Sequence, residues 1–439
     1  MKQETKFKDT EIGMIPDDWE IDTLGNHTNL IKGISYRSED YCSEEDGLIF
    51  INLKCVRRNG GFRKEGIKYY NGGITEEQFV KPGEILIANT DITQNREVIG
   101  SPVKVPDLKN DRQMCISLDL SKLDVTSKNL DSNFLYYYLM SPRARHFMIS
   151  NGNGTTVVHL STKNVPNMII PLPNMREQTA IAKILSDLDS KIELLQKQNK
   201  TLEAIGQAIF KHRFVDFEFP DEEGKPYKSS GGEMVDSEFG EIPRGWGVGT
   251  LGDICEITMG QSPPGKTYNE IGKGTPFYQG NRDFGFRFPT RRVYCTAPTR
   301  FAEEGNVLLS VRAPVGNLNV AEERCAIGRG VAALRLNGTQ HGYLYYLLRA
   351  TQSGWNEFEA EGTVFGSANK SDVQGFKVVI PPNKSKEQFA SLIKSLDDQI
   401  INNEKQSRAL ISIRDTLLPK LMSGELRVSA TGKLPEVIE

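Results

Sequence analysis

The chain has 439 residues, a formal net charge of −3 and six cysteines. A chain of this length predicts at least two domains with sizeable cores. The slightly acidic balance excludes a surface that is basic throughout, so any contact with nucleic acid must come from local patches.

The cysteines and the amino terminus indicate the compartment. No two cysteines form a Cys-x-x-Cys pair, so we expect reduced thiols rather than a disulfide or zinc framework. Residues 1–8 lack the apolar core of a signal peptide, and no apolar run reaches the length of a membrane span. We therefore expect a soluble, cytoplasmic protein.

The opening of the chain returns in its second half. Residues 11–19 read Glu-Ile-Gly-Met-Ile-Pro-Asp-Asp-Trp, and residues 238–246 read Glu-Phe-Gly-Glu-Ile-Pro-Arg-Gly-Trp, at an offset of 227. Thr-Leu-Gly follows each tryptophan at the same distance. The matched spacing predicts an internal duplication, and we interpret Trp19 and Trp246 as core anchors rather than ligand contacts.

Two more segments repeat and indicate a mixed α/β fold. Residues 81–87 and 303–309 each combine a turn with a buried strand. Residues 133–139 and 342–348 are rich in leucine and tyrosine, and Asp131-Ser132 before the first of them predicts a capped short helix. Such tyrosines can stack on bases, but at helical spacing they are more often core residues, which is our interpretation.

Residues 174–212 predict a long helix with a narrow apolar stripe. The stripe advances in alternating steps of four and three residues, as in a coiled coil, through Ile181, Leu185, Leu188, Ile192, Leu195, Leu202 and Ile209. A second stripe runs through residues 385–421, at Phe389, Ile393, Leu396, Ile400, Leu410, Leu417 and Leu421. We predict that the two helices pair as an antiparallel coiled coil within the chain. Asn199 and Asn403 lie within the stripes and are candidates for setting the register.

The segment between the halves has the composition of a linker. Residues 216–239 combine acidic side chains with glycine, serine and proline, which predicts an exposed, loosely ordered connection. The predicted fold is mixed α/β, with two similar globular domains separated by two long helices. Its segments are a first globular domain (1–173), a first long helix (174–215), the linker (216–239), a second globular domain (240–382), a second long helix (383–425) and a tail (426–439).

Residues 260–267 match the P-loop pattern Gly-x4-Gly-Lys-Thr, but we predict no nucleotide site there. Pro263 and Pro264 remove two of the backbone N–H groups that such a loop aims at phosphates. Ser262-Pro263-Pro264 also resembles an adenine methyltransferase motif, but Gly265 replaces the aromatic residue that stacks on the flipped base. No Ser/His/Asp, Cys/His or metal cluster repeats between the halves, so we predict no catalytic residues and no metal site.

Each globular domain carries stretches rich in basic and amide side chains. Arginine pairs with guanine, asparagine and glutamine pair with adenine, and lysine or arginine neutralises phosphate, so these residue types suit DNA. The alternative is that they are ordinary solvated loops. The candidates in the first domain are Lys54, Arg57, Arg58, Asn59, Arg63, Lys64, Asn89, Thr90, Gln94, Asn95 and Arg96. Those in the second domain are Gln279, Asn281, Arg282, Arg287, Arg291, Arg292, Arg312 and Asn317.

Over essentially its whole length the chain resembles a specificity subunit of a type I restriction–modification system. The resemblance rests on Ile-Pro-x-x-Trp at 15–19 and 242–246, and on the linker motifs Phe-Glu-Phe-Pro (217–220) and Gly-Glu-Ile-Pro (240–243). It also rests on the junctions Ile-Pro-Leu-Pro (170–173) and Ile-Pro-Pro (380–382), each followed by Glu-Gln. In this family each globular unit is a target-recognition domain that recognises one half of an interrupted DNA site. The long helices are a spacer that also binds modification subunits.

The resemblance implies a non-catalytic chain within a larger complex. Its expected partners are double-stranded DNA, methyltransferase (modification) subunits and ATP-dependent endonuclease (restriction) subunits. No cofactor is expected in this chain, and S-adenosylmethionine, ATP and Mg²⁺ are expected in the partner subunits. Because residues 88–93 and 310–316 differ between the halves, we predict a bipartite, non-palindromic target. Two other classes stay open: a restriction–methylation enzyme acting alone, and a coiled-coil adaptor without DNA contact.

Overall fold

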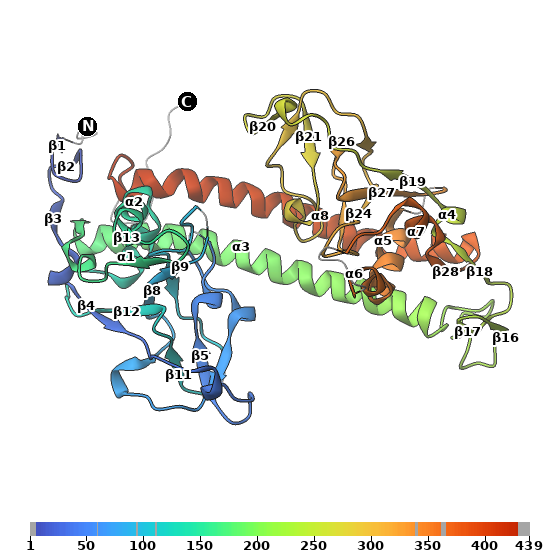
Figure 1. Cartoon of the computed structure of the whole chain (residues 1–439), viewed down its shortest axis with the longest axis horizontal. Coiled ribbons are helices and arrows are strands. Elements are labelled where there is room, and N and C mark those ends of the chain that lie inside the picture. The colour runs from blue at the N-terminus through green and yellow to red at the C-terminus, as the bar shows by residue number, and fades with distance from the viewer. Residues whose placement is uncertain are drawn as a thin grey trace. The chain divides into compact units, whose positions relative to one another are not determined.

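The chain divides into two units in a computed structural model, which describes residues 6–58, 60–93, 95–109, 112–338, 341–360 and 366–428. Unit 1 contains Met1–Glu193 and Arg408–Glu439, and unit 2 contains Leu194–Ser407. The division falls within both long helices, α3 (Met175–Phe210) and α8 (Asn383–Met422), which Figure 1 draws in green and red.

Unit 1 is built around two four-stranded sheets. Its strands are β1 (Phe7–Lys8), β2 (Ile15–Pro16), β3 (Glu20–Thr23), β4 (Thr28–Lys32), β5 (Leu48–Ile51), β6 (Lys68–Tyr70), β7 (Phe79–Val80), β8 (Ile85–Ala88), β9 (Thr90–Asp91), β10 (Pro102–Lys104), β11 (Met114–Ile116), β12 (Leu120–Val125), β13 (Gly152–Asn153), β14 (Val158–Leu160) and β15 (Ile169–Leu172). Its short helices are α1 (Ser132–Met140) and α2 (Pro142–Ser150). The antiparallel sheet has the order β10-β8-β12-β4, and the mixed sheet has the order β6-β5-β11-β7.

Unit 2 repeats this architecture. Its strands are β16 (Met234–Ser237), β17 (Gly240–Pro243), β18 (Gly247–Thr250), β19 (Cys255–Met259), β20 (Tyr268–Asn269), β21 (Thr275–Tyr278), β22 (Tyr294–Cys295), β23 (Phe301–Ala302), β24 (Val307–Ser310), β25 (Leu318–Val320), β26 (Cys325–Ile327), β27 (Val331–Leu336) and β28 (Lys377–Ile380). Its short helices are α4 (Leu251–Ile254), α5 (His341–Ala350), α6 (Glu357–Ala360) and α7 (Lys370–Gly375).

The duplication is visible in the strand order. The sheet β25-β24-β27-β19 of unit 2 corresponds to β10-β8-β12-β4 of unit 1, and β22-β21-β26-β23 corresponds to β6-β5-β11-β7. Each mixed sheet has its parallel pair at the same place, β5 with β11 and β21 with β26. The internal repeat predicted from residues 11–19 and 238–246 is therefore confirmed.

Both tryptophans are core anchors, as predicted. Trp19 is fully buried in unit 1, where its Nε1 donates a hydrogen bond of 3.1 Å to Glu177. Trp246 is buried in unit 2, against the aromatic rings of Phe214 and Phe217. A tryptophan buries a large apolar ring, while its single N–H group can bind a polar partner.

The first tyrosine-rich helix has the predicted cap, and both helices have the predicted burial. Asp131 Oδ1 accepts the N–H groups of Asn133 and Phe134 at 2.9 and 3.0 Å, which satisfies free donors at the start of α1. Tyr137 in α1 and Tyr346 in α5 are buried in the cores of units 1 and 2. Their interpretation as core residues, rather than base-stacking residues, is confirmed.

The long helices begin and end close to their predicted bounds. In unit 2 the amide of Asn403 in α8 donates to Oδ1 of Asn199 in α3 at 2.8 Å, and both asparagines are buried. In unit 1 Arg414 of α8 pairs with Asp189 of α3 at 2.7 Å. Asn199 and Asn403, the two candidate register residues, therefore contact each other. Within the described residues no helix is both long and apolar enough to cross a membrane.

The linker is more ordered than its composition predicts. The ring of Phe219 stacks on Trp246 at 5.0 Å and on Tyr227 at 4.6 Å, between centroids. Near the end of the linker, β16 pairs with β17. Most of the linker is exposed, as predicted. The expectation that it is loosely ordered was wrong, because its aromatic residues bury apolar surface against Trp246.

Candidate DNA interface

A basic hollow of about 460 Å³ lies on unit 1, between the segment after β5 and the loop after β9. It is lined by the predicted candidates Lys54, Arg57, Arg58 and Arg63, and by the apolar residues Leu53, Val56, Ile92 and Val98. The four basic side chains are exposed, and Lys64 is exposed next to them. Asn59 lies outside the described residues. The structure thus brings most of the first basic stretch together around one hollow.

Ile92 gives this hollow an apolar component at the surface. Its side chain is 69 % exposed, although it lines the hollow together with the arginines. Arginine can bind the acceptor edge of guanine, and an aliphatic side chain can contact the methyl group of thymine. The hollow therefore combines the two kinds of contact by which a major groove is read.

The loop after β9 is held in place by a buried carboxylate. Asp91 accepts the N–H groups of Thr93, Val98 and Ile99 at 2.6–2.7 Å. Burial alone would raise the pKa of Asp91, but these hydrogen bonds lower it below its ordinary value. Buried Arg145 of α2 donates to the carbonyls of Ile99 and Glu97 from the other side, at 2.7 and 3.3 Å. Burial lowers the pKa of Arg145 to about 10, against the nearby charge of Asp91.

Three candidates on this stretch have structural roles instead. Asn89 is buried, and its amide donates to Leu118 O and Ser121 Oγ at 3.0 and 2.9 Å. Thr90 is buried in β9. The guanidinium of Arg96 donates to the carbonyls of Ile149, Gly152 and Gly154 at 3.3–3.4 Å.

The prediction of DNA contacts is therefore corrected for Asn89 and Thr90, because neither side chain reaches the surface. Arg96 is half-buried and holds the loop against α2 and β13. Asn95 is exposed, so it stays a candidate. Gln94 lies outside the described residues.

The candidates of unit 2 lie on two loops. One is loop 279–292, between β21 and β22, and the other follows β24. Exposed candidates are Gln279, Arg282, Arg291 and Arg312, and half-buried ones are Asn281, Arg292 and Asn317. The structure joins the two loops, because Asn317 Nδ2 donates to Asn281 Oδ1 at 2.7 Å.

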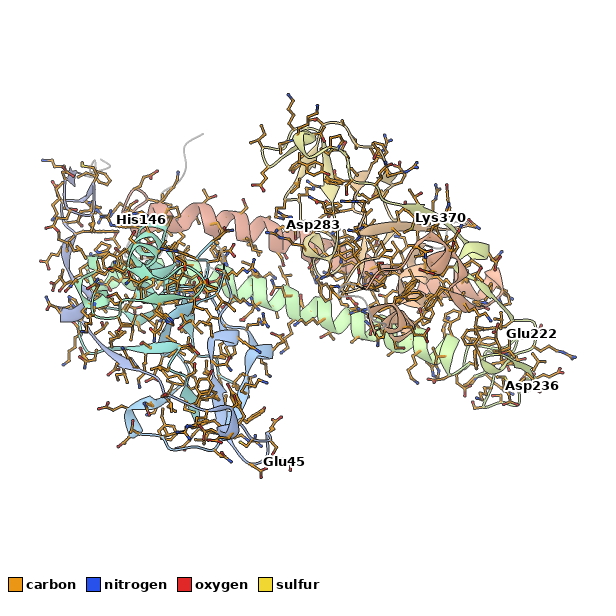
Figure 2. All side chains as sticks on the ribbon, viewed as in Figure 1. Glu45, His146, Glu222, Asp236, Asp283 and Lys370 are labelled. Atoms are coloured by element: carbon orange, nitrogen blue, oxygen red, sulfur yellow. The ribbon has the colours of Figure 1, made fainter. Side chains whose placement is uncertain are left out.

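Acidic neighbours orient two of these arginines. Arg292 pairs at 2.9 Å with Asp283, a buried residue that Figure 2 labels, and Arg291 pairs at 2.7 Å with Glu323. Asp283 Oδ2 also accepts the N–H of Gln279 at 2.6 Å, which closes the start of the loop. Loop 279–292 is thus built around its own buried carboxylate.

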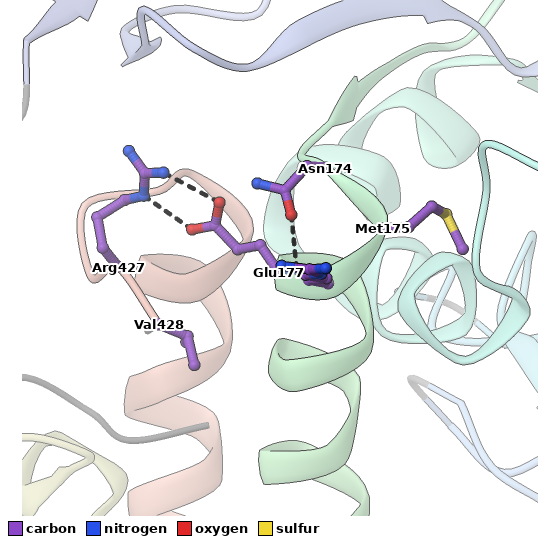
Figure 3. A pocket seen from close by; sticks show the side chains of 6 residues that line it. Asn174, Met175, Glu177, Arg427 and Val428 are labelled. Carbon is purple, nitrogen blue, oxygen red and sulfur yellow. Dashed lines mark hydrogen bonds and ion pairs between the residues drawn. The ribbon is translucent and has the colours of Figure 1, made fainter. Parts of the chain in front are cut away.

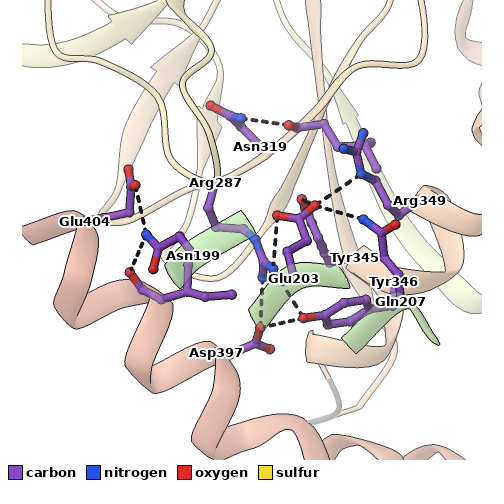
Figure 4. A network of polar contacts seen from close by, with 12 residues as sticks. Asn199, Glu203, Gln207, Arg287, Asn319, Tyr345, Tyr346, Arg349, Asp397 and Glu404 are labelled. Atoms are coloured by element: carbon purple, nitrogen blue, oxygen red, sulfur yellow. Dashed lines mark hydrogen bonds and ion pairs between the residues drawn. The ribbon is translucent and has the colours of Figure 1, made fainter. Parts of the chain in front are cut away.

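Arg287, in the middle of this loop, is not at the surface. It is only 4 % exposed, and it pairs with Asp397 of α8 at 2.9 Å and with Glu203 of α3 at 3.6 Å (Figure 4). Its guanidinium carbon lies 3.9 Å from the ring centroid of Tyr345, and it donates to Tyr346 Oη at 3.3 Å. The predicted DNA contact of Arg287 is corrected, because these groups enclose its side chain.

The charges of this cluster compensate one another. Burial alone would lower the pKa of Arg287, but the neighbouring tyrosines, Tyr345 and Tyr346, and then the carboxylates of Asp397 and Glu203 raise it above its ordinary value, so the guanidinium stays charged. Burial raises the pKa of Asp397, and the charge and hydrogen bonds of Arg287 oppose that rise. A buried arginine is tolerable only with such partners.

Sequence reasoning missed Ile92 and Glu203. An isolated aliphatic residue among polar ones, as in Thr90-Asp91-Ile92-Thr93, is a usable signal for a surface contact. For Glu203 no signal was available, because its partner Arg287 lies in a different part of the chain and neither residue has unusual neighbours. In the described ranges no group of three or more His, Cys, Asp or Glu side chains is placed to hold a metal ion.

A second hollow, of about 480 Å³, lies at the start of α3 in unit 1. Its polar groups bind one another: Arg427 pairs with Glu177 at 2.8 Å, and Asn174 accepts the N–H of Glu177 at 3.1 Å (Figure 3). Arg427 also pairs with Asp18 at 2.7 Å, and its hydrogen bond lowers the pKa of that carboxyl group below the ordinary range. The ion pairs of Arg427 in this hollow therefore join the segment after α8 to the core of unit 1.

The chain matches one protein family in both halves. The model of the "Type I restriction modification DNA specificity domain" family matches residues 16–204 and 243–411. The chain is 29 % identical to the putative type I restriction enzyme MjaX specificity subunit of Methanocaldococcus jannaschii, over 97 % of this chain and 98 % of that protein. It is 26 % identical to the MjaIX specificity subunit of the same organism, over 97 % of each.

A solved structure shows the same fold. The type I restriction–modification system S subunit from M. genitalium has a TM-score of 0.56 and 20 % identity, with 92 % of this chain and 96 % of that chain covered. The family model matches most of the chain, and its two segments coincide with the duplicated sheets. The chain therefore belongs to the family of type I restriction–modification DNA specificity proteins.

Proposed function

We propose that this chain is the DNA-recognition subunit of a type I restriction–modification complex, and that each unit recognises one half of a bipartite, asymmetric site. The observation that carries the proposal is the duplication of the family segment on two units with different loops. In unit 1, β9 pairs with β14, whereas the corresponding loop of unit 2 forms a single bridge between Arg312 and Ser367. Equal scaffolds with different loops suit two different half-sites.

In this proposal α3 and α8 pair as an antiparallel coiled coil that separates the two recognition surfaces. Supporting contacts occur within each unit. Asp189 pairs with Arg414 in unit 1, and Asn199 pairs with Asn403 in unit 2, so the residue number rises along α3 as it falls along α8. A helix rises 1.5 Å per residue, so about 23 residues span the ~34 Å of one turn of DNA.

The chemistry would be carried out by other subunits. Modification subunits would carry S-adenosylmethionine and methylate adenine, and restriction subunits would carry ATP and Mg²⁺ and cleave DNA. This chain would place them on the site without a catalytic step of its own. The prolines and the short 3-10 turn at residues 265–267 leave residues 260–267 without the long helix that a nucleotide loop precedes.

Methylome sequencing tests the function directly. We expect the full-length chain, co-expressed with its modification subunit in a host without adenine methylation, to direct methylation to one motif with two different half-sites and an unspecified spacer. A continuous or palindromic motif would contradict the proposal. Methyl transfer by the purified chain alone would place it instead among enzymes that act alone.

Arg57 and Arg58 are expected to serve one half-site only. Alanine at both positions should weaken binding of the complex to a duplex with an intact first half-site by about 5- to 150-fold, which corresponds to ~1–3 kcal/mol. Binding to a duplex in which only that half-site is scrambled should change little. Competition binding at constant salt measures both.

The matched control is Arg37→Ala. The side chain of Arg37 is 82 % exposed in unit 1 and does not line the basic hollow. Its replacement is expected to leave both affinities within twofold. If Arg57→Ala/Arg58→Ala weakened binding to both duplexes equally, these arginines would contact phosphates and not bases.

A further inference from the structure

A tyrosine–aspartate hydrogen bond is duplicated with the rest of the fold. In unit 1 the hydroxyl of Tyr137 donates to Asp189 Oδ2 at 2.9 Å, and in unit 2 the hydroxyl of Tyr346 donates to Asp397 Oδ1 at 3.0 Å. The tyrosines lie on the corresponding helices α1 and α5. The aspartates lie on the long helices in the matching sequences Leu-Asp-Ser-Lys-Ile and Leu-Asp-Asp-Gln-Ile.

The two aspartates are neutralised by arginines from different parts of the fold, one from a long helix and the other from a loop. Asp189 is paired by Arg414 of the opposite long helix, at 2.7 Å. The residue that corresponds to Arg414 in the first long helix is Gly206, since Leu-x-x-Ile precedes both. A Cβ atom at Gly206 would lie 2.4 Å from the hydroxyl of Tyr346, so no side chain fits there. Asp397 is paired instead by Arg287, from loop 279–292.

Because Arg287 takes the place of a helix residue, it connects a surface loop to both long helices. Arg287 also reaches Glu203 of α3, at 3.6 Å, and Glu203 is 3 % exposed. The candidates Gln279, Asn281 and Arg282 precede Arg287 in the loop, and Arg291 and Arg292 follow it. Among the described residues of unit 1, the cation that pairs with Asp189 is Arg414, which belongs to the long helix α8 and not to a loop.

A second route joins the same loop to the same carboxylate. Asn281 accepts from Asn317 at 2.7 Å, and Asn317 accepts from Gln352 at 3.4 Å. Gln352 accepts from Arg349 at 2.7 Å, and Arg349 donates to Glu203 at 3.2 Å. Asn281 and Arg287 are thus fixed to Glu203 along two separate chains of polar contacts, which restricts rotation of the loop as well as its translation.

We propose that Arg287 is a positioning residue, which sets the base selectivity of the second half-site by fixing loop 279–292 to α3 and α8. This inference rests on the proposed function and adds a residue that does not itself touch DNA. Its side chain is enclosed by Glu203, Asp397, Tyr345 and Tyr346, so it acts through the exposed side chains on either side of it. Loss of this anchor frees those side chains to accommodate other bases.

The test is the methylome directed by the full-length chain, co-expressed with its modification subunit in a methylation-free host. With Arg287→Gln, we expect methylation at sites carrying one wrong base in the second half-site to rise about tenfold over the natural chain, because one mismatch ordinarily lowers affinity about 5- to 150-fold. Selectivity at the first half-site should not change. Arg287→Lys, which keeps the charge but lacks the fork that spans two carboxylates, should give a smaller rise at the same positions.

Arg414→Gln is the matched control. This substitution removes the corresponding cation from Asp189 in unit 1. Because Arg414 lies on α8 and not on a loop, we expect a lower melting temperature and an unchanged motif. A sharp motif with Arg287→Gln, or equal loss of selectivity in both half-sites, would overturn the inference.

Two further outcomes are separable. If Arg287→Gln yields no soluble complex, the lysine variant decides, because its motif is then either relaxed at the second half-site or sharp. If the natural chain directs no bipartite methylation, the proposed function fails, and that failure is seen without any variant.

Discussion

Replacement of Phe389 by alanine is expected to lower the free energy of unfolding of unit 2 by about 3–5 kcal/mol. Phe389 is fully buried on α8, and its ring lies nearly edge-on to those of Phe210, Phe214 and Tyr346, with centroids 5.3–5.6 Å apart. Alanine would remove the ring and leave a cavity that the neighbouring rings fill only in part. A loss of this size is a large share of the ~5–15 kcal/mol that stabilises a typical domain.

Urea denaturation followed by circular dichroism measures this loss as an earlier transition of unit 2. Leu392→Ala is the control on the same helix, because Leu392 is 44 % exposed, and its replacement should change the free energy of unfolding by less than ~1 kcal/mol. Equal shifts for both variants would show that shortening any apolar side chain of α8 has the same effect, and that the aromatic cluster has no special weight.

Replacement of Asp91 by asparagine is expected to destabilise unit 1 by about 2–4 kcal/mol and to release the loop that carries Ile92 and Asn95. The carboxylate accepts three backbone N–H groups in a fully buried position. An amide of the same shape has only one acceptor oxygen, and its NH₂ group would face N–H donors. Hydrogen exchange of Val98 and Ile99 should accelerate, and binding to the first half-site should weaken.

The pH dependence of this effect has a definite sign. The folded-state pKa of Asp91 is lowered, so its contribution to stability is complete above the unfolded pKa of ~3.9 and is lost as the pH falls through the lower folded value. The difference in free energy of unfolding between the natural chain and Asp91→Asn should therefore be constant from pH 5 to pH 8 and shrink below about pH 4.

Glu97→Gln controls for the loss of a negative charge on the same loop. Glu97 pairs with Arg58 at 3.2 Å, and the Arg58 side chain is 65 % exposed, so this surface pair should contribute less than ~1 kcal/mol. An equal loss of stability in Glu97→Gln and Asp91→Asn would contradict a specific role for the three buried hydrogen bonds.

Regular spacing made much of the fold predictable. The stripes of α3 and α8 depend only on where apolar residues recur, and both helices begin and end within a few residues of the predicted bounds. A polar residue within such a stripe is a candidate for setting the register, and the two candidates, Asn199 and Asn403, bind each other. The matched spacing of the two halves predicted two similar globular domains, and the corresponding strand orders of the two units confirm this.

The candidate interface was only partly predictable, because residue type does not determine the direction of a side chain. Arg57 and Arg287 have the same chemistry and similar glycine-rich surroundings, yet one is exposed and the other is enclosed by two carboxylates. The difference depends on contacts between residues distant in the chain, such as Arg287 with Glu203. Asn89 likewise binds Ser121 across neighbouring strands.

The packed linker determines where two specificity chains can exchange halves. Phe214, Phe217 and Phe219 precede the second recognition segment, yet their rings contact Trp246, within the core of unit 2. A crossover within residues 220–240 would therefore join these three rings to a tryptophan from another parent. Hybrids made there will fold when both parents keep these rings, whereas a crossover within α3, before Phe210, transfers the cluster intact. New pairs of half-sites can thus arise by exchange of unit 2, provided that Arg414 and Arg427, which are exchanged with it, pair with Asp189 and Glu177 of the other parent.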